Sequence, residues 1–382
     1  MPGLILALAS CGGGDPGPRP ASVVATDAGT PDAAIRDAQI QDARAPNTVP
    51  DGGQIDPTGG TGGIGVADAG FFPGIDCTSD AADHPTVLGC TGLYSDWPSR
   101  TLSPYVTAYD PGLHLWSDGA QKNRYIYLPK GTKIDTSNMD EWTFPVGTRV
   151  WKEFVLGGQK VETRLLWKRA PGRKGWFRTT YQWSADGSTA VELTSGAVLP
   201  SGYEIPSADK CVSCHIGRID NILGFEAIGL STPQATGETM AKLVSDGLLT
   251  NPPAAPFVIP GNPVEVAAIG WLHANCGTAC HNPSPSSFAG QTGLFMRLET
   301  GQLGSVQATN VYLTAVNQPS NFQTSATSNF LLIAPGDVSR SCIPFRDGYR
   351  DTQGENIQMP PFDTHVVDDA GVGAVKAWIQ AM

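Results

Sequence analysis

The side chains from which a protein core is built are missing from a long stretch near the start of this chain. Residues 12–70 contain no Trp, Tyr, Phe, Lys, Glu or Cys, and their eight Asp outnumber three Arg. Such a segment cannot bury enough apolar surface to offset the conformational entropy that it would lose on folding. We therefore expect residues 12–75 to form a disordered, self-repelling tether, with a folded body that begins near Phe71.

The composition of the whole chain excludes several classes of protein. Among its 382 residues, 25 Lys and Arg stand against 36 Asp and Glu, whereas a nucleic-acid-binding protein is expected to be basic. Only 16% of the residues are charged, which argues against a coiled coil or a long helical bundle. The sequence has no run of about 18 apolar residues, the length that a transmembrane helix requires.

Residues 1–11 contain a short apolar run that ends in Leu8-Ala9-Ser10-Cys11. This ending resembles the lipobox of bacterial lipoproteins, in which the cysteine becomes the acylated first residue of the mature protein. We therefore expect a signal segment at 1–11 and lipid on Cys11, whose acyl chains insert into a membrane. The glycine that follows is typical of lipoproteins of the outer membrane, so the expected location is the cell envelope, facing the periplasm or the cell surface. A chance apolar start with a free cysteine is the alternative.

Cys77 and Cys90 flank a short polar loop. In an exported protein, two such cysteines are expected to form a disulfide that closes the loop. Two separate thiols are the alternative.

Residues 76–205 are predicted to form a β-rich domain. Polar and apolar residues alternate over several short runs, as expected for half-buried strands. Turn-forming pairs such as Gly157-Gly158 and Pro171-Gly172 separate the runs. The pattern predicts an antiparallel sandwich or a barrel-like domain. The runs cover residues 124–128, 149–155, 161–167 and 176–183.

The motif Cys211-Val212-Ser213-Cys214-His215 follows this domain. It is the attachment motif of c-type haem, in which two thiols form thioethers with the vinyl groups and the histidine binds the iron. A zinc site normally needs a second Cys or His pair, and a redox dithiol normally accompanies a βαβ unit. We therefore expect Cys211, Cys214 and His215 to hold haem c, with those two kinds of site as alternatives.

A second motif at residues 276–281 (CGTACH) has one residue more between its thiols. The extra residue either bulges out, which leaves Cys276, Cys280 and His281 to hold a second haem c, or the site has lost haem and its cysteines form a disulfide. The small residues of the spacer favour the bulge.

Cys342 is the one cysteine to which these expectations assign no role, and we expect it to be buried as a small apolar residue. If the second haem were lost, it would be free to pair with a motif cysteine.

The order of elements around the second motif is that of a class I cytochrome c domain. An apolar helix is predicted over 264–272, and a closing helix over 368–381. Between the motif and the closing helix lies Met359, followed by Pro360-Pro361. We expect the Met359 thioether to bind the iron opposite His281, because a Met/His pair is a known haem ligand set that raises the reduction potential. A core or surface role for Met359 is the alternative.

The sequence leaves the distal ligand of the first haem open. Met240 lies on a helix predicted over 233–249, and His273 lies just before the second motif. Both are weaker candidates for iron ligands. A core methionine and a hydrogen-bonded core histidine are the stronger alternatives.

Charged residues recur at regular positions in the predicted strands. Their simplest interpretation is a solvated sheet face with cross-strand ion pairs. The alternative is a face that packs over the haem segment or over a small ligand. These residues are Lys122, Arg124, Lys152, Glu153, Glu162 and Arg164.

Taken together, the motifs resemble the bacterial dihaem c-type cytochromes that carry a β-rich domain ahead of two haem motifs. The resemblance covers roughly residues 90–382 and implies haem binding and electron transfer, without fixing a substrate. The second motif departs from the family, which has the ordinary Cys-x-x-Cys-His spacing there. The matching stretches are 111–122 (PGLHLWSDGAQK), 142–148 (WTFPVGT), 162–164 (ETR), 206–215 (PSADKCVSCH), 271–283 (WLHANCGTACHNP) and 359–361 (MPP).

The expected fold is α+β, with a β-rich domain at 76–205, a first haem c segment at 206–270 and a mainly helical cytochrome c-like domain at 271–382. The leading hypothesis is a membrane-tethered electron carrier with two haems c that meets redox partner proteins of the envelope and no nucleic acid. A peroxidase-like haem enzyme, with an open iron site under the β-rich domain, is one alternative. A carbohydrate- or surface-binding module that carries haem is another.

Overall fold

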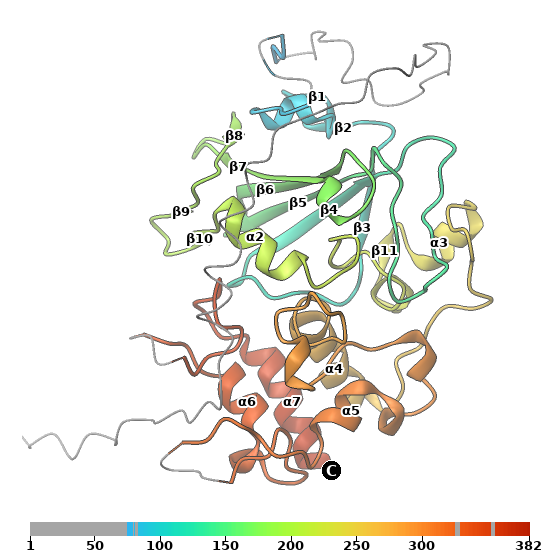
Figure 1. Cartoon of the computed structure of the whole chain (residues 1–382). Coiled ribbons are helices and arrows are strands. Elements are labelled where there is room, and N and C mark those ends of the chain that lie inside the picture. The colour runs from blue at the N-terminus through green and yellow to red at the C-terminus, as the bar shows by residue number, and fades with distance from the viewer. Residues whose placement is uncertain (1–74, 79, 81–82, 325–328, 353–355) are drawn as a thin grey trace, which may run out of the picture.

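The computed structural model describes residues 75–78, 80, 83–324, 329–352 and 356–382. The expected signal segment, the lipid attachment at Cys11 and the tether up to residue 74 lie outside these residues. The described chain combines one large antiparallel sheet with several helices, so the α+β class is confirmed at this level (Figure 1).

A seven-stranded antiparallel sheet forms the centre of the N-terminal half. Its strand order is β11-β3-β4-β5-β6-β7-β8. Because β11 and β8 lie at its edges, the sheet is open rather than closed into a barrel. The strands are β3 (Thr107–Asp110), β4 (Gln121–Tyr127), β5 (Arg149–Leu156), β6 (Gln159–Lys168), β7 (Trp176–Trp183), β8 (Ala190–Glu192) and β11 (Thr236–Gly237).

The predicted strands are confirmed with small shifts at their ends. β5 and β6 form a hairpin around Gly157 and Gly158, whose φ angles are +57° and +81°. Glycine adopts this left-handed region at little cost because it has no Cβ, and the two long strands can therefore reverse in a tight turn. The resulting register places Lys152 directly opposite Arg164 on one face of the sheet.

The described residues between 75 and 106 cover one face of the sheet, at the top of Figure 1. On this face Trp97 stacks on Trp183, with 5.6 Å between ring centroids, and Trp151 is fully buried. Large aromatic surfaces therefore hold the N-terminal segment to the strands. The segment contains the 3-10 helix η1 (Leu88–Thr91) and a ribbon of β1 (Tyr94–Asp96) with β2 (Thr101–Leu102).

The expected disulfide between Cys77 and Cys90 is present, with their Cα atoms 5.7 Å apart. It closes a loop whose ends are 13 residues apart. By the chain-entropy estimate, such a link stabilises the fold by about 3 kcal/mol.

The opposite face shares a core with the chain that follows the first motif. Side chains from residues 222–249 pack with those of the sheet, so this part of the chain returns to the β-rich half. The helix predicted over 233–249 is wrong at both ends: α3 (Met240–Ser245) begins later and ends earlier. It begins later because the preceding residues pair with β3 as strand β11, and the Thr239 side chain caps the helix.

The C-terminal half is built on two helices that cross closely, α4 (Pro263–Leu272) and α7 (Asp369–Ala381), and both agree with the predicted helices. A Cβ on Gly371 would lie 1.9 Å from the indole nitrogen of Trp271, so glycine is required at the crossing. That nitrogen donates a hydrogen bond to Asp368 at 2.7 Å. The other helices of this half are α5 (Asn310–Ala315), α6 (Cys342–Asp347), η5 (Gly290–Thr292), η6 (Thr300–Gln302), η7 (Val306–Ala308) and η8 (Val338–Arg340).

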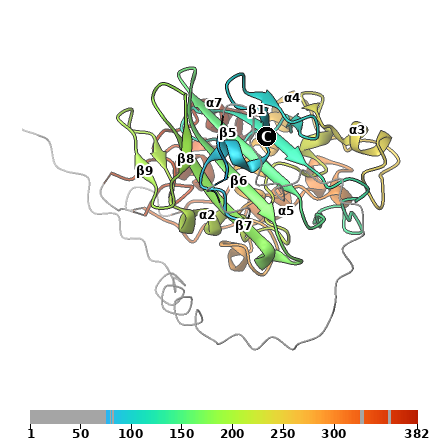
Figure 2. The same ribbon diagram turned by 90° about the horizontal axis from the view of Figure 1, so that it is seen from above.

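Seen from above, the sheet lies across the helices of the C-terminal half (Figure 2). The helix α2 packs on β7, on the side of the sheet that faces these helices (Figure 1). None of the described helices is both long and apolar enough to cross a bilayer. The remaining elements are α2 (Ala208–His215), η2 (Arg173–Gly175), η3 (Gly229–Ser231) and a ribbon of β9 (Ala197–Val198) with β10 (Glu204–Ile205).

A buried ion pair joins the sheet to the loop that follows the first motif. The ammonium of Lys168 lies 2.6 Å from Asp220, and each side chain is only 2% exposed. The indole N–H of Trp176 and the backbone N–H of Phe144 also donate to Asp220, at 2.8 and 2.6 Å. A buried carboxylate is costly unless it is paired and fully hydrogen-bonded, so these donors are what allow the loop to dock.

We expect Lys168→Met to lower the free energy of unfolding by about 3–5 kcal/mol, because it leaves Asp220 as an uncompensated buried charge. Lys174→Met, at an exposed position in η2, is the matched control and should change stability by less than about 0.5 kcal/mol. Denaturant unfolding of both variants checks the prediction. A loss no larger than that of the control would contradict the role assigned to the pair.

Candidate functional site

The first motif occupies most of α2, which ends at His215. Cys211 and Cys214 are free, half-buried thiols about one helical turn apart, so they lie on the same side of the helix. Burial raises the pKa of both thiols, that of Cys214 to about 12. Both groups are therefore neutral thiols near pH 7.

His215 is oriented by the chain that follows it. Its Nδ1 lies 2.5 Å from the carbonyl oxygen of Asn221, so Nδ1 carries the proton and donates. Burial, and after it the positive charge of Lys152, lowers the pKa of His215 to about 3. The imidazole is therefore neutral, and within the described chain its Nε2 has no hydrogen-bond partner. Metal-binding histidines typically have this arrangement, with one nitrogen bound to a carbonyl and the other available.

The carbonyl that orients His215 is itself held by the sheet. Asp220 precedes Asn221 and is anchored by Lys168. The side-chain amide of Asn221 donates to the carbonyl of Arg173 at 2.8 Å. Sequence reasoning missed these supporting residues, because the motif carries no information about which group accepts the histidine proton; only their nearness to the motif was a signal.

A π-helical turn accommodates the extra residue of the second motif. It spans His273–Gly277 (η4) and continues directly from α4. The backbone N–H of Thr278 donates to the carbonyl oxygen of His273 at 2.9 Å. The backbone N–H of His281 donates to the carbonyl oxygen of Cys276 at 2.8 Å, and both bonds span five positions. A π-helical turn holds more residues than an α-helical turn. The insertion therefore widens the helix, as the bulge alternative predicts.

The disulfides that would accompany loss of haem are not formed. Cys276 and Cys280 are both free thiols in the structure. Cys342, in α6, is also free and is 2% exposed. It is a buried side chain of the helical half, as the cysteine count predicts.

A segment that runs after the second motif supports it closely. A Cβ on Gly277 would lie 2.3 Å from the backbone nitrogen of Arg297 and 2.5 Å from the carbonyl carbon of Met296. The Nδ1 of His281 lies 3.3 Å from the carbonyl oxygen of Leu294 in the same segment. Burial lowers the pKa of His281 to about 4. The second histidine is therefore neutral and oriented by a backbone carbonyl, like the first.

We expect Gly277→Ala to destabilise the protein by about 1–3 kcal/mol, because the added methyl group meets backbone that cannot move aside without strain. Gly373→Ala in α7 is the control, since nothing lies within 4 Å of a Cβ there. In a helix, that replacement should stabilise by up to about 1 kcal/mol. Thermal unfolding separates the two. Equal effects of the same sign would show that the close approach at Gly277 carries no cost.

Met359 and Cys276 line the same pocket, together with Trp116, Trp271 and Pro360. Met359 is half-buried. The tertiary structure therefore brings one thiol of the second motif to the sulfur that the sequence predicts as an iron ligand, although they are far apart in the chain. The two tryptophans give the pocket an apolar lining.

A buried carboxyl group lies at the same pocket. Asp347, at the end of α6, is 5% exposed, and its Oδ2 has no hydrogen-bond partner among the residues described. Burial raises the pKa of Asp347 to about 7, against the opposing charges of Arg350 and Arg346. Near neutral pH, this group therefore holds a proton for about half of the time.

We expect the stability of the protein to fall in part through Asp347 as the pH rises. Its pKa is raised in the folded state, so the folded chain holds a proton that the unfolded chain releases between about pH 4 and 7. Asp347→Asn removes this titrating group. The free energy of unfolding of the variant, relative to that of the wild type, should therefore rise by up to about 4 kcal/mol from about pH 4 to pH 8. Urea unfolding at both pH values measures the gain, with the exposed Asp83→Asn as control. A difference that is the same at both pH values would contradict the shift.

The two motifs lie against each other. A Cβ on Gly217, just after the first motif, would lie 1.7 Å from the carbonyl oxygen of Ala279 in the second. Ser286, beyond the second motif, donates its hydroxyl to the carbonyl of Ile216 at 2.8 Å. Groups bound at the two motifs would therefore be close neighbours.

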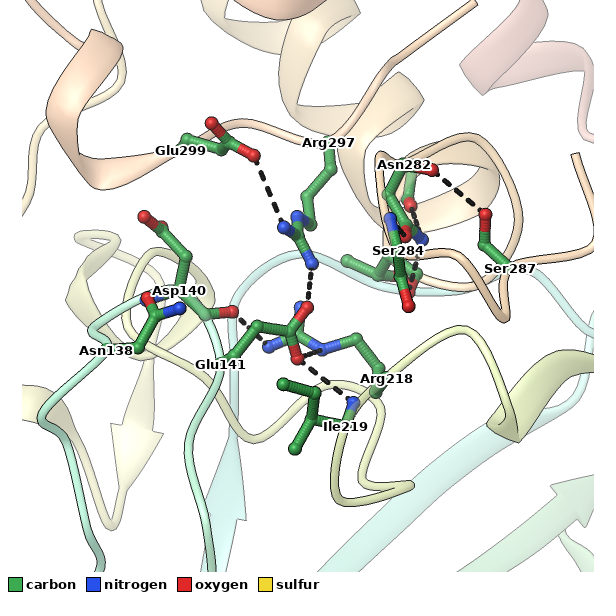
Figure 3. Close-up of polar contacts among 12 residues, drawn as sticks. Asn138, Asp140, Glu141, Arg218, Ile219, Asn282, Ser284, Ser287, Arg297 and Glu299 are labelled. Carbon is green, nitrogen blue, oxygen red and sulfur yellow. Dashed lines mark hydrogen bonds and ion pairs between the residues drawn. The ribbon is translucent and has the colours of Figure 1, made fainter. Parts of the chain in front are cut away.

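Glu141 links both motif segments to the β-rich half (Figure 3). One of its carboxylate oxygens forms an ion pair with Arg297. The other lies 3.4 Å from Nε of Arg218 and accepts a hydrogen bond from the backbone N–H of Ile219 at 3.1 Å. Arg218 follows the first motif, whereas Arg297 lies in the segment that packs on Gly277. The side chains of the carboxylate and both arginines are less than a tenth exposed.

The structure places both weaker candidate ligands in core positions. Met240 is 1% exposed and packs among the apolar side chains beneath the sheet. The Nδ1 of His273 accepts a hydrogen bond from the N–H of Leu298 at 2.9 Å, and its Nε2 lies 3.5 Å from Glu226. Burial acts to raise the pKa of Glu226, but the neighbouring His273, the charge of Arg218 and the backbone N–H of Ile228 lower it to about 2.

The charged residues of the central strands are largely buried, so the expected solvated sheet face is wrong. Glu153 and Glu162 are both 0% exposed. Glu162 accepts two hydrogen bonds from Arg164, at 2.8 and 2.6 Å, and one from the hydroxyl of Tyr203 at 2.8 Å. Glu153 lies on the other face, 2.8 Å from Lys160. Alternation of charge along a strand shows which residues share a face, but it does not show whether that face is covered.

Among the described residues, no group of three or more His, Cys, Asp or Glu side chains is placed to hold a metal ion. A haem iron needs fewer ligands from the protein than such a site, since the porphyrin holds it as well. Comparisons with protein-family models, curated proteins and solved structures each found no match to this chain.

Proposed function

We propose that this protein is a dihaem c-type cytochrome that transfers single electrons. The observation that carries the proposal is common to both motifs. Each presents two free thiols beside a neutral histidine whose Nδ1 faces a backbone carbonyl. In the described chain, Nε2 of His215 and of His281 has no hydrogen-bond partner. Thioether attachment of haem and ligation of its iron require these groups in this state.

The second site has a further feature in favour of the proposal. Met359 shares a pocket with Cys276, and its thioether would serve with His281 as a second protein ligand of the iron. A Met/His pair favours reduced iron. The indole rings of Trp116 and Trp271 would keep water from this side of the site.

When bound, haem supplies the one-electron redox couple. The protein contributes orientation and a low-dielectric setting. The carbonyls of Asn221 and Leu294 hold the histidine protons at Nδ1, which keeps each Nε2 as a lone-pair donor. The π-helical turn would keep His281 in register with its cysteines in spite of the longer spacer.

The contact between the motifs favours direct electron exchange between the two haems. The backbone at Gly217 packs on the carbonyl of Ala279, so no other segment separates the helix ends that carry the ligands. We further propose that lipid on Cys11 holds the protein in the cell envelope. A formal net charge of −11 would there steer basic redox partner proteins toward it through weak encounters.

The number of covalently bound haems in the full-length protein tests this proposal. We expect the denatured protein to exceed its polypeptide mass by two haems. The pyridine haemochrome spectrum should indicate two thioethers per haem. Cys276→Ala should convert one haem to a single thioether link, whereas Cys342→Ala, the control at a buried free cysteine, should change neither measurement.

An increase of only one haem would contradict the second site. No covalently bound haem in protein matured by a c-type haem attachment system would overturn the proposal as a whole.

A haem enzyme is the second candidate, and one observation favours it. The residues that the sequence offers as distal ligands for the first haem are engaged elsewhere: Met240 in the core and His273 with Leu298 and Glu226. An iron on His215 that is open on its other side would bind a small substrate such as peroxide. A high-spin ferric component at the first site would indicate chemistry, and two low-spin haems would indicate an electron carrier.

A further inference from the structure

A row of cations crosses the sheet face that lies beneath the first motif. Arg124, Lys152 and Arg164 are paired in register on three neighbouring strands, β4, β5 and β6. Arg178 of β7 pairs with Leu166, two positions from Arg164, and so lies on the same face.

This row points toward the haem motif. The row shares its face with Val150 and Leu166, on which residues 222–249, from the chain after the motif, pack. The helix α2, which carries the motif, packs on β7, the strand of Arg178. Arg173, just before β7, donates to the carbonyl of Ile216, directly after His215, at 3.1 Å. These contacts place the motif beside the β7 end of the row.

Two members of the row have carboxylate partners. Arg164 binds Glu162 through two hydrogen bonds. Arg124 lies 3.3 Å from Asp110. Their charges are therefore compensated by the chain itself.

The other two members have no carboxylate partner within the described residues. Lys152 donates only to the backbone carbonyl of Leu223, at 2.8 Å. Burial, followed by the charges of Arg124 and Arg164, lowers its pKa to about 7. Arg178 makes no ion pair or hydrogen bond in this part of the chain, and its Nε is buried without a partner.

Such an arrangement is costly in a protein that binds nothing there. Like charges on neighbouring strands repel each other, and a half-buried cation without a counter-charge loses part of the solvation that it had in water. Thr180, opposite Arg164 on β7, adds a buried hydroxyl that also has no partner in the described structure. An anion with several acceptor oxygens would supply both the missing counter-charge and the missing hydrogen-bond acceptors.

We propose that Lys152, Arg178 and Thr180 form an oxyanion site that binds a carboxylate group beside the first motif. Arginine matches the planar geometry of a carboxylate, and the lysine and hydroxyl supply further donors. The carboxylate comes either from a propionate of the haem attached to this motif or from a small free dicarboxylate. If the carboxylate is a haem propionate, the inference rests on the proposed function, and it specifies which side chains neutralise the charge of that propionate.

The reduction potential of the first haem in the full-length, haem-loaded protein tests the site. Removal of a nearby positive charge makes it harder for the iron to gain an electron. Arg178→Gln and Lys152→Met should each lower the equilibrium constant for reduction by about threefold to tenfold, where tenfold corresponds to about 59 mV. Arg178→Lys, which keeps the charge, should restore most of the loss. Lys130→Met, at an exposed turn, is the control and should leave the constant unchanged.

A titration of the wild-type protein with succinate distinguishes the two sources of the carboxylate. If a propionate occupies the site, succinate should cause no saturable change in potential or in the visible spectrum. If a free dicarboxylate occupies it, succinate should cause a saturable shift that Arg178→Gln abolishes. This titration and Arg178→Gln decide the question even if Lys152→Met does not fold.

The proposal is overturned if Arg178→Gln carries both haems, has the same potential as Lys130→Met, and succinate has no effect on the wild type. A wild-type protein that carries no haem at the first motif is a different result. It contradicts the proposed function before the oxyanion site is tested.

Discussion

The buried carboxylate of Glu141 is the contact on which the relative placement of the two motifs depends. It lies in the β-rich half, and it binds one arginine from the segment after each motif, Arg218 and Arg297. A buried ion pair contributes little net stability, but the loss of one partner costs about 3–5 kcal/mol because a charge is left uncompensated. Alternative dockings of the helical half on the sheet would break this triad. The triad thus specifies the arrangement that brings Gly217 against Ala279.

Both motif histidines are oriented in the same way, although the local structures differ. His215 ends a regular α-helix, and His281 follows a π-helical turn, yet each has Nδ1 facing the carbonyl of a later residue. In each case that later segment is held by a buried charge pair, through Asp220 in the first site and through Arg297 in the second. Buried electrostatic contacts therefore set the orientation of both histidines, while apolar packing supplies the stability.

The surroundings of the two sites differ in charge. Lys152 and Arg178, which have no carboxylate partner among the described residues, lie beside the first motif, whereas apolar rings, a thioether and the side chains of Asp347, Arg350 and Asp368 line the pocket of the second. Local charge and polarity change the relative free energies of two oxidation states. If the proposed haems are bound at these sites, they would have distinct potentials, and electron flow between them would have a preferred direction.

Local pattern was sufficient for most of the regular structure. The alternation in residues 161–167 and the apolar spacing of the closing helix each specify an element through contacts between near neighbours, and the structure contains both. The helix expected over 233–249 begins only at Met240, because β3 provides a pairing partner for the residues before it. The charges on the central strands show the same limitation, since their periodicity cannot show that α2 covers the face.

The sequence by itself determined which reactive groups this protein can offer and in what order. It has two motifs that each place two thiols and a histidine within a few residues, then a later methionine and a closing helix. Covalent spacing along the chain sets these features, so they do not depend on how the chain packs. Only the tertiary structure decided that a π-helical turn absorbs the insertion, that Met359 and Cys276 line one pocket, and that Lys152 and Arg178 share the sheet face beside the first motif. Those arrangements depend on burial and charge pairing between residues that are remote in sequence, and such energies exist only once the chain has packed.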